Sequence, residues 1–425
     1  MKKIIAILMV FIGVNSFSKY DFPMKNPYVA TIIGSSQIMT EGIPDKVPTK
    51  EYSVVLDENR YIPANMWYEK GFKYSLSKQE GKAPLIFILS GTGSKYDSVR
   101  TKNFKKIFYN AGYHVLTVTS AFNSNFIINV SNSKVPGILL QDGLDLYRVM
   151  EKMLEQAKEK DKIEVDGVYL TGYSMGATHS AVISYIDSKK KYFNFERVFL
   201  INPAVNLYYS STALDNMLNK NIKSKKDIGK IVDKVVELIG KNISSMSLEI
   251  DTESIYAMFK HHELSNREME TLIGLAFNLT SVDVNYVVDL VNNLKVYTKV
   301  QPTKFQNMFP YFEKINFANF NNYLEKLAYP YYCKILGGNL KFQDMIRYGD
   351  LELFENYLKN EKKIAAVTNQ DDFILSSSDR EFIKGTFKER SLIYPYGGHC
   401  GNMFYQNNVD RMLKFLEKGE FNNEL

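Results

Sequence analysis

Gly172-Tyr173-Ser174-Met175-Gly176 is the stretch of sequence on which the prediction of the fold depends. It follows an apolar run at 168–171 that is typical of a buried strand, and it precedes a helical pattern at 177–186. A G-x-S-x-G segment between a strand and a helix is a nucleophile elbow, in which the serine takes a strained backbone conformation and the glycines leave room for the helix to pass close to the strand. Although the same letters occur in ordinary turns, the flanking strand and helix favour a catalytic role for Ser174.

Alternating strand and helix patterns surround this elbow on both sides. A sequence of this order favours a mostly parallel sheet flanked by helices on both faces, an α/β fold. Strands are predicted at 84–89, 113–118, 198–201, 364–368 and 392–394, and helices at 97–110, 136–158, 377–384 and 409–418. An edge strand is predicted at 51–57, with 65–70 as its hairpin partner.

The alternation stops for about 150 residues after 204, where the patterns are almost all helical. An apolar stripe at 228–239 keeps the helical period, and Ser265 with Glu268 forms a capping box ahead of 269–277. We therefore predict a helical cap on top of the sheet. The predicted divisions are a signal peptide at 1–18, an extended segment at 19–50 in which a turn at 33–35 breaks any helix, a core at 51–204 and 360–425, and the cap at 205–359.

The N-terminus resembles an export signal. Lys2 and Lys3 precede an apolar run at 4–14, and Ser16-Phe17-Ser18 forms a small-x-small cleavage site. The run has 11 residues, well short of the roughly 20 that span a bilayer, and no other stretch is expected to span one. We predict an exported protein, periplasmic or extracellular, with an uncleaved anchor as the alternative.

The composition, net charge and cysteine content limit the classes of protein to which the chain could belong. With 45% hydrophobic and 24% charged residues the chain has a globular composition. Its net charge of +6, which falls by two without Lys2 and Lys3, is too mild to indicate nucleic-acid binding. The two cysteines, Cys333 and Cys400, cannot define a disulfide framework, but we predict that they approach each other at the mouth of the site, where a bridge would tie the lid to the catalytic loop; two free thiols are the alternative, which we favour.

A catalytic serine needs a histidine to accept its proton, and His399 is the best placed of the five histidines. It lies in the glycine-rich loop Tyr396-Gly397-Gly398-His399-Cys400-Gly401, between the last predicted strand and helix. His179 is predicted to pack or to be exposed on the helix after Ser174, and His114 to lie at the surface. His261 and His262 are adjacent, so on a helix they make a poor metal pair.

The acid that orients His399 is expected just after a strand, where Asp371 and Asp372 stand side by side. A simple turn is the alternative, since Asp favours turns. The end of the preceding strand, 202–209, offers no carboxylate, which favours the Asp371–Asp372 position. For the oxyanion, Ser90-Gly91-Thr92-Gly93 follows a buried strand and lacks the spacing of a phosphate-binding loop.

Together these residues resemble the α/β-hydrolase superfamily, in the chain order Ser…Asp…His and over roughly 51–204 and 360–418. The resemblance implies Ser174 as nucleophile, His399 as base and Asp372 as orienting acid, with oxyanion donors from the Thr92 and Met175 backbones and neither cofactor nor metal. Asp372 is preferred over Asp371 because the apolar Ile374 follows it two residues later, as in the family's acid loop. Ser90 departs from the family, where many members place His before Gly.

The resemblance also implies a substrate pocket beneath the cap. Besides Gly91 and Tyr173, the candidates for it are Phe309, Phe312 and Tyr331, from a stretch at 305–332 that is crowded with aromatic residues. An aromatic stripe more often forms core, and we favour that interpretation for the stretch as a whole. Lysines between 220 and 234 surround the stripe at 228–239, which is compatible with peripheral contact with a membrane surface, although a solvated lid face is the interpretation we favour.

The sequence therefore predicts an exported serine hydrolase acting on carboxylic esters, with a small-molecule or lipid-like acyl substrate. An acyltransferase or peptidase with the same triad stays open, as does a hydrolase-like binding module. The sequence does not define the acyl chain, the alcohol portion or the oligomeric state.

Overall fold

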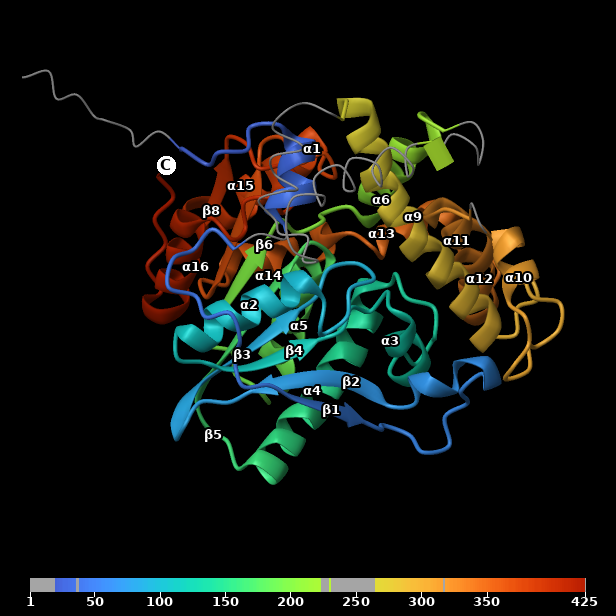
Figure 1. Cartoon of the computed structure of the whole chain (residues 1–425), viewed down its shortest axis with the longest axis horizontal. Coiled ribbons are helices and arrows are strands. Elements are labelled where there is room, and N and C mark those ends of the chain that lie inside the picture. The colour runs from blue at the N-terminus through green and yellow to red at the C-terminus, as the bar shows by residue number, and fades with distance from the viewer. Residues whose placement is uncertain (1–19, 36–37, 223–228, 231–263, 316–317, 425) are drawn as a thin grey trace, which may run out of the picture.

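A computed structural model of the chain describes residues 20–35, 38–222, 229–230, 264–315 and 318–424. At its centre is an eight-stranded sheet in the order β1-β2-β4-β3-β5-β6-β7-β8 (Figure 1). The strands are β1 Lys50–Val54, β2 Phe72–Ser77, β3 Lys82–Leu89, β4 His114–Val118, β5 Glu164–Tyr173, β6 Arg197–Ile201, β7 Ile364–Asn369 and β8 Ser391–Tyr394. From β4 to β8 all neighbours are parallel, while β2 runs antiparallel to β1 and β4. The predicted fold class is confirmed.

The middle of the sheet is buried on both faces, as its apolar runs predicted. In β3, Leu85, Phe87 and Leu89 join one hydrophobic cluster, and the alternating Ile86 and Ile88 join the other. This alternation follows from the two-residue period of a strand. The sheet therefore separates two cores, each of which needs its own layer of helices.

Those layers come from the helices between the strands. On one face α4 Leu139–Asp161 and α5 Met175–Lys190 pack beside α3 Ser124–Asn129 and α15 Ser377–Phe387. The other face is covered by α2 Val99–Asn110 and α16 Gln406–Lys418. Shorter elements are η2 Ala64–Glu69 and η5 Lys388–Arg390.

The long helical block enters between β6 and β7, and most of its described helices gather at one end of the sheet (Figure 1), whereas the last of them packs against α5 and α15 on one face. They are α6 Leu207–Asn219, α9 Asn266–Val291, α10 Phe309–Ile315, α11 Phe320–Tyr323, η3 Leu324–Ala328, α12 Tyr329–Leu336, α13 Phe342–Arg347, η4 Leu351–Phe354 and α14 Glu355–Asn360. The Ser265–Glu268 capping box is present, but α9 runs on to Val291. The apolar stripe at 228–239 and most of the lysines around it lie outside the described residues, as do His261 and His262.

Helix α9 is also the one described helix that is long and apolar enough to cross a membrane by length and composition, which the sequence did not lead us to expect. Half of its most apolar window is buried inside the protein. Its last turns, including Val284 and Val288, belong to the hydrophobic core. Such burial is typical of the core helix of a folded domain.

The N-terminal segment differs from the prediction. Residues 27–34 are helical, with α1 Pro27–Val29 continuing into the π-helix η1 Ala30–Gly34, so the predicted turn at 33–35 does not break the helix. The side chain of Asn26 caps this helix by accepting hydrogen bonds from the Tyr28 and Val29 amides. The helix packs over the glycine-rich loop that carries His399, where the carbonyl oxygen of Gly401 leaves no room for a Cβ at Gly34.

Two smaller predictions were also wrong. Residues 65–69 lie in the 3-10 helix η2 and not in a strand, and β2 is the antiparallel partner of β1. His114 is fully buried in β4 and not at the surface. Both of its ring nitrogens have polar partners there: the Gln79 backbone N–H donates to Nδ1, and the carbonyl oxygen of Glu164 lies beside Nε2.

Candidate active site

The elbow has the strained geometry that its sequence predicts. Ser174, between β5 and α5, has a φ of 54° and a ψ of −127°, a conformation that costs free energy for any residue but glycine. A Cβ at Gly172 would lie 2.4 Å from the Gly176 backbone, and one at Gly176 would lie 2.2 Å from the Leu89 carbonyl oxygen. Both glycines therefore allow α5 to pass directly against the strands, and the Ser174 side chain is held at the sheet edge.

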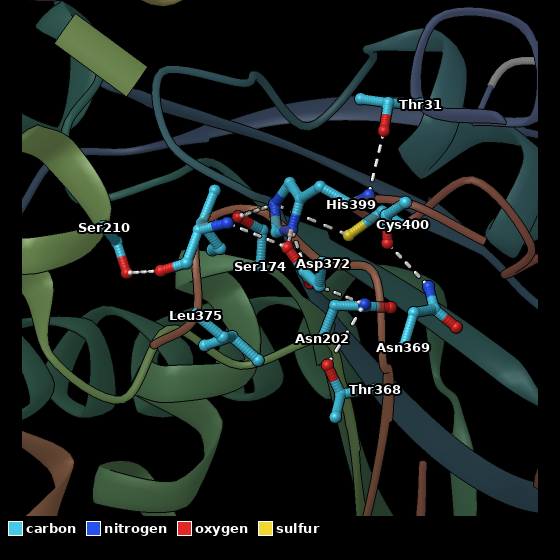
Figure 2. Close-up of polar contacts among 12 residues, drawn as sticks. Thr31, Ser174, Asn202, Ser210, Thr368, Asn369, Asp372, Leu375, His399 and Cys400 are labelled. Atoms are coloured by element: carbon cyan, nitrogen blue, oxygen red, sulfur yellow. Dashed lines mark hydrogen bonds and ion pairs between the residues drawn. The ribbon is translucent and has the colours of Figure 1, made fainter. Parts of the chain in front are cut away.

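His399 lies between Ser174 and Asp372 (Figure 2). Its Nε2 is 2.8 Å from Ser174 Oγ, and its Nδ1 is 3.0 and 3.1 Å from the two carboxylate oxygens of Asp372. With the ring proton on Nδ1 facing the carboxylate, Nε2 is free to accept the proton of the serine hydroxyl. Three residues far apart in the chain thus form one continuous hydrogen-bonded row.

Asp372 is fixed on its other side by two donors. Asn202, at the end of β6, donates from Nδ2 to Asp372 Oδ2 at 2.8 Å, and the Ile374 amide donates to Oδ1 at 3.2 Å. Ile374 is buried, as the spacing of the acid loop implied. The end of β6, where the sequence has no carboxylate, therefore supplies the side-chain amide of Asn202, which holds the carboxylate of Asp372 after β7.

The sheet and the order of these three residues identify the fold. A mostly parallel sheet carries a strained serine at a strand-to-helix turn, followed along the chain by an aspartate and then a histidine that contact it in that order. The chain has the α/β-hydrolase fold.

Several solved α/β-hydrolase structures are distantly similar to the chain. A fungal esterase from Rhizomucor miehei is 12% identical with a TM-score of 0.42, covering 92% of this chain and 88% of its own. A hyperthermophilic esterase from the archaeon Pyrobaculum calidifontis is 13% identical with a TM-score of 0.39, covering 92% and 89%. An acylaminoacyl peptidase from Pyrococcus horikoshii is 10% identical with a TM-score of 0.40, covering 90% of this chain and 43% of its own. The fold assignment rests on this chain's own sheet and elbow. No family model and no curated protein matches the sequence.

The N-terminal helix holds the His399 backbone, which the sequence did not predict. The His399 amide donates to Thr31 Oγ1 at 2.8 Å (Figure 2), and that hydroxyl donates in turn to the Pro27 carbonyl at 2.7 Å. Next to it, Ser35 Oγ donates to the Cys400 carbonyl oxygen at 3.2 Å. The segment at 20–35 is therefore part of the wall that sets the position of the imidazole.

Asp371 has a different role from its neighbour. Its carboxylate accepts hydrogen bonds from the Gly398 amide at 2.9 Å and the Gly397 amide at 3.3 Å. Asn369 donates to the Gly398 carbonyl oxygen at 2.7 Å. Burial raises the pKa of Asp371, although the two glycine amides partly offset that effect. Asp371 is therefore more than a turn residue, because it anchors the loop that carries His399.

The candidate oxyanion donors lie beside Ser174. Met175 is the first residue of α5, where the helix leaves its backbone N–H without an intrahelical partner, and Thr92 lines the same cleft as Ser174. At Gly91 a Cβ would lie 2.8 Å from the Tyr173 ring and 3.3 Å from Ser174 Cβ, so this loop approaches the elbow only because it has no side chain there. Ser90, where the sequence departs from the family, contacts the Thr101 hydroxyl at 2.9 Å and does not line the cleft.

A cleft of about 410 Å³ opens over Ser174 and His399. It includes the predicted Gly91, Thr92 and Tyr173, but most of its apolar wall comes from elsewhere. Helix α9 supplies Leu272, Ile273, Ala276, Phe277 and Thr280, and the remaining apolar lining is Ile32, Leu214 and Phe373. Because a Cβ at Gly93 would meet the Thr280 side chain at 2.4 Å, α9 lies directly on the oxyanion loop.

The structure places Phe309 and Tyr331, two of the three pocket candidates from the stretch at 305–332, outside this cleft. Phe309 is 66% exposed, and Tyr331 packs against the core beside Tyr332, while the side chain of Phe312 lies outside the described residues. Phe320 and Tyr323 from the same stretch are buried core residues. The stretch at 305–332 therefore contributes core, because its helical stripe faces α9 and the loop before α4.

The other candidate residues lie apart from the row. His179 is buried on α5, with Nε2 3.8 Å from Asp142 Oδ2, so the alternative of an exposed His179 is excluded. Both cysteines are free thiols, so the bridge we considered is not formed. Cys333 faces the Leu340 carbonyl oxygen, whereas Cys400 Sγ lies 3.8 Å from His399 Nε2. The thiols have separate partners.

Thr31 provides a test of the N-terminal wall. Thr31→Val removes the acceptor of the part-buried His399 amide, and leaving a fully buried group unsatisfied costs about 1–3 kcal/mol unless the loop moves. We expect the loop to shift and kcat for an ester substrate to fall by about 10- to 100-fold, since a small misplacement of a catalytic group is costly. Steady-state kinetics and melting temperature would be measured together.

Thr31→Ser keeps the acceptor and should restore kcat. Thr40→Val is the matched control, because the Thr40 hydroxyl donates to Phe404 from the same segment without reaching His399. An unchanged kcat in Thr31→Val, or an equal loss in Thr40→Val, would contradict a positioning role.

Proposed function

We propose that this chain is a serine hydrolase that cleaves carboxylic esters through a covalent acyl-enzyme. The observation that carries the proposal is the row from Ser174 Oγ through His399 to Asp372 at a strained elbow. A serine at the edge of a cleft that contacts a histidine oriented by a buried carboxylate is the arrangement that activates a hydroxyl for attack on a carbonyl carbon.

Each residue has a defined task in this reaction. Ser174 Oγ attacks the ester carbonyl while His399 Nε2 accepts its proton, and the Thr92 and Met175 amides hydrogen-bond the oxyanion of the tetrahedral intermediate. His399 then donates the proton to the alcohol oxygen, which leaves. Water attacks the acyl-enzyme as His399 takes one of its protons, the acid departs, and Ser174 regains its proton. Asp372 keeps the imidazole in the productive tautomer throughout.

The cleft favours a substrate with an apolar body. Its wall carries leucine, isoleucine and phenylalanine side chains from α9 and its surroundings, and each buried CH₂ group of a ligand contributes about 0.8 kcal/mol. A small-molecule or lipid-like acyl ester fits this chemistry. Hydrolysis of a series of p-nitrophenyl esters of increasing chain length tests the proposal; no turnover of any ester, together with no labelling by a fluorophosphonate, would refute it.

The same assay separates hydrolysis from acyl transfer. A supplied alcohol or amine acceptor should leave the rate of acid release largely unchanged if water is the natural acceptor. If the acceptor diverts most of the acyl group, the enzyme is an acyltransferase. If peptide amides are cleaved faster than esters, it is a peptidase.

The activity should depend on pH through His399. Burial lowers the pKa of this imidazole, but the carboxylate of Asp372 and the neighbouring Cys400 outweigh that effect and raise it from 6.5 to about 10. Since only the neutral ring can accept the serine proton, kcat/KM should rise with pH well above 6.5. In Asp372→Asn the rise should move to lower pH, because the negative charge that stabilises the imidazolium is gone; a pH–rate profile of both proteins checks this.

We also propose that the chain is exported to the periplasm or the extracellular space. The basis is the pattern of Lys2, Lys3 and the apolar run at 4–14, which precedes a small-x-small site. Peripheral contact of the lysine-rich stretch at 220–234 with a membrane surface also stays a proposal. Cell fractionation and N-terminal sequencing of the mature protein test export, and retention of Met1 in a cytosolic fraction would refute it.

A further inference from the structure

The cleft over Ser174 contains one permanent positive charge, Arg100, in the first turn of α2. The only other ionisable groups among its described lining residues are His399 and the hydroxyl of Tyr173, and none of those residues is a carboxylate. The rest of the wall is apolar or carries neutral hydroxyl groups. A ligand in this cleft therefore meets an isolated cation beside a largely apolar surface.

Arg100 has no partner for its charge among the described residues. Its guanidinium group takes part in none of their hydrogen bonds, ion pairs or aromatic contacts, although it presents five N–H donors and is partly buried. Asp97, three residues earlier, makes no ion pair with it. Taking a cation partly out of water without a partner costs free energy, and the described part of the chain offers Arg100 nothing that offsets this cost.

The position within α2 adds a second unfavourable term. Arg100 is the second residue of the helix, and the first turn contains no acidic residue. The N-terminal end of a helix carries a partial positive charge that repels cations. In contrast, Lys102 on the same helix is exposed to solvent, where water screens its charge.

We propose that Arg100 binds an anionic oxyacid group, a carboxylate or a phosphate, of a substrate whose ester carbonyl lies at Ser174. The substrates would then be esters with an apolar body and one anionic end. A bound oxyanion would satisfy the fork of N–H donors and offset both unfavourable terms, since guanidinium pairs with carboxylate and phosphate in bidentate geometry. This inference rests on the proposed function of Ser174.

The test compares matched esters that differ only in charge. One pair is the p-nitrophenyl monoester of a dicarboxylic acid and the same compound with its free carboxylate methylated. A second pair carries a phosphomonoester in one member and its neutral dimethyl triester in the other. We expect the wild type to prefer the anionic member of at least one pair by about 10- to 100-fold in kcat/KM, and the pair that responds distinguishes carboxylate from phosphate.

Three variants assign the preference to Arg100. Arg100→Gln should reduce the ratio to within about twofold while hydrolysis of the neutral esters continues, and Arg100→Glu should favour the neutral member. Lys102→Gln is the control for a general loss of positive charge and should leave the ratio unchanged. Melting temperatures verify folding of each variant.

The outcomes separate this inference from the proposed function. Hydrolysis of the neutral esters with no preference for either anionic ester overturns the role of Arg100 alone. The role of Arg100 is also overturned if Arg100→Gln keeps the full preference for the anionic ester. Absence of both turnover and fluorophosphonate labelling in the wild type instead overturns the assignment of Ser174, on which this inference rests.

Discussion

Ser174→Ala is expected to abolish ester hydrolysis, with kcat falling by about 10⁶, the loss seen when a serine nucleophile is removed from a triad. Covalent labelling by a fluorophosphonate should disappear as well, because the probe reacts with an activated hydroxyl. The variant should fold, since alanine keeps the backbone of the elbow and removes only the Oγ atom that contacts His399. Labelling, turnover and circular dichroism would be measured on purified protein.

Ser188→Ala is the matched control. Ser188 lies on the same helix, α5, and its hydroxyl donates to the Tyr185 carbonyl oxygen, away from the elbow. This variant should keep full labelling and turnover. Undiminished labelling of Ser174→Ala would place the reactive group elsewhere in the chain and would remove the central claim of the proposed function.

The elbow could be predicted from the sequence because its determinants are local. Gly172 and Gly176 flank Ser174 within five residues, and the strand and helix on either side have apolar patterns of their own. The parallel strands of the sheet were likewise predictable, since burial on both faces leaves continuous apolar runs, whereas β2 was missed. Asp372 and His399 followed from their places after a strand and within a glycine-rich loop, although their contact depends on the whole fold.

The N-terminal wall could not be predicted in the same way. Thr31 and His399 are 368 residues apart, and a single threonine carries no sign of the backbone amide that it will accept. The helix itself did leave a local signal, because Asn26 followed by Pro27 is a typical N-cap with proline at the first helical position. In the prediction, the polar residues of this segment and Gly34 outweighed that signal. Gly34 is there because the Gly401 carbonyl oxygen leaves no room for a side chain.

The substrate cleft was the least predictable part of the site. Aromatic residues suit both a core and a pocket, so the crowded stretch at 305–332 could not distinguish the two. Helix α9 supplies most of the wall through residues such as Leu272 and Phe277, which in sequence read only as one face of an amphipathic helix. Arg100 has no motif at all, and only its place in the cleft, with no partner in the described part of the chain, sets it apart.

Asp372→Asn should lower kcat by up to about 10⁴, the loss seen when the acid of a well-studied triad is neutralised. An amide at this position fits the same space, but it replaces an acceptor oxygen by an N–H group. Both Asn202 and His399 donate to the carboxylate of Asp372. The NH₂ group of an asparagine side chain would have to face one of these two donors, and where it faces His399 it favours the wrong imidazole tautomer. Steady-state kinetics on the purified variant measure the loss, and its melting temperature reports on folding.

Asp371→Asn is the matched comparison, because it makes the same chemical change one residue earlier. Its carboxylate accepts hydrogen bonds from Gly397 and Gly398, and the oxygen of an amide can retain the shorter of these. We expect a loss of about tenfold or less, since the change loosens the loop that carries His399 and leaves the tautomer of His399 unaffected. Among the described residues, Asp372 supplies the single buried carboxylate in contact with His399 Nδ1, so the larger loss is expected there. A larger loss at Asp371 than at Asp372, or no substantial loss at either, would show that another group orients His399.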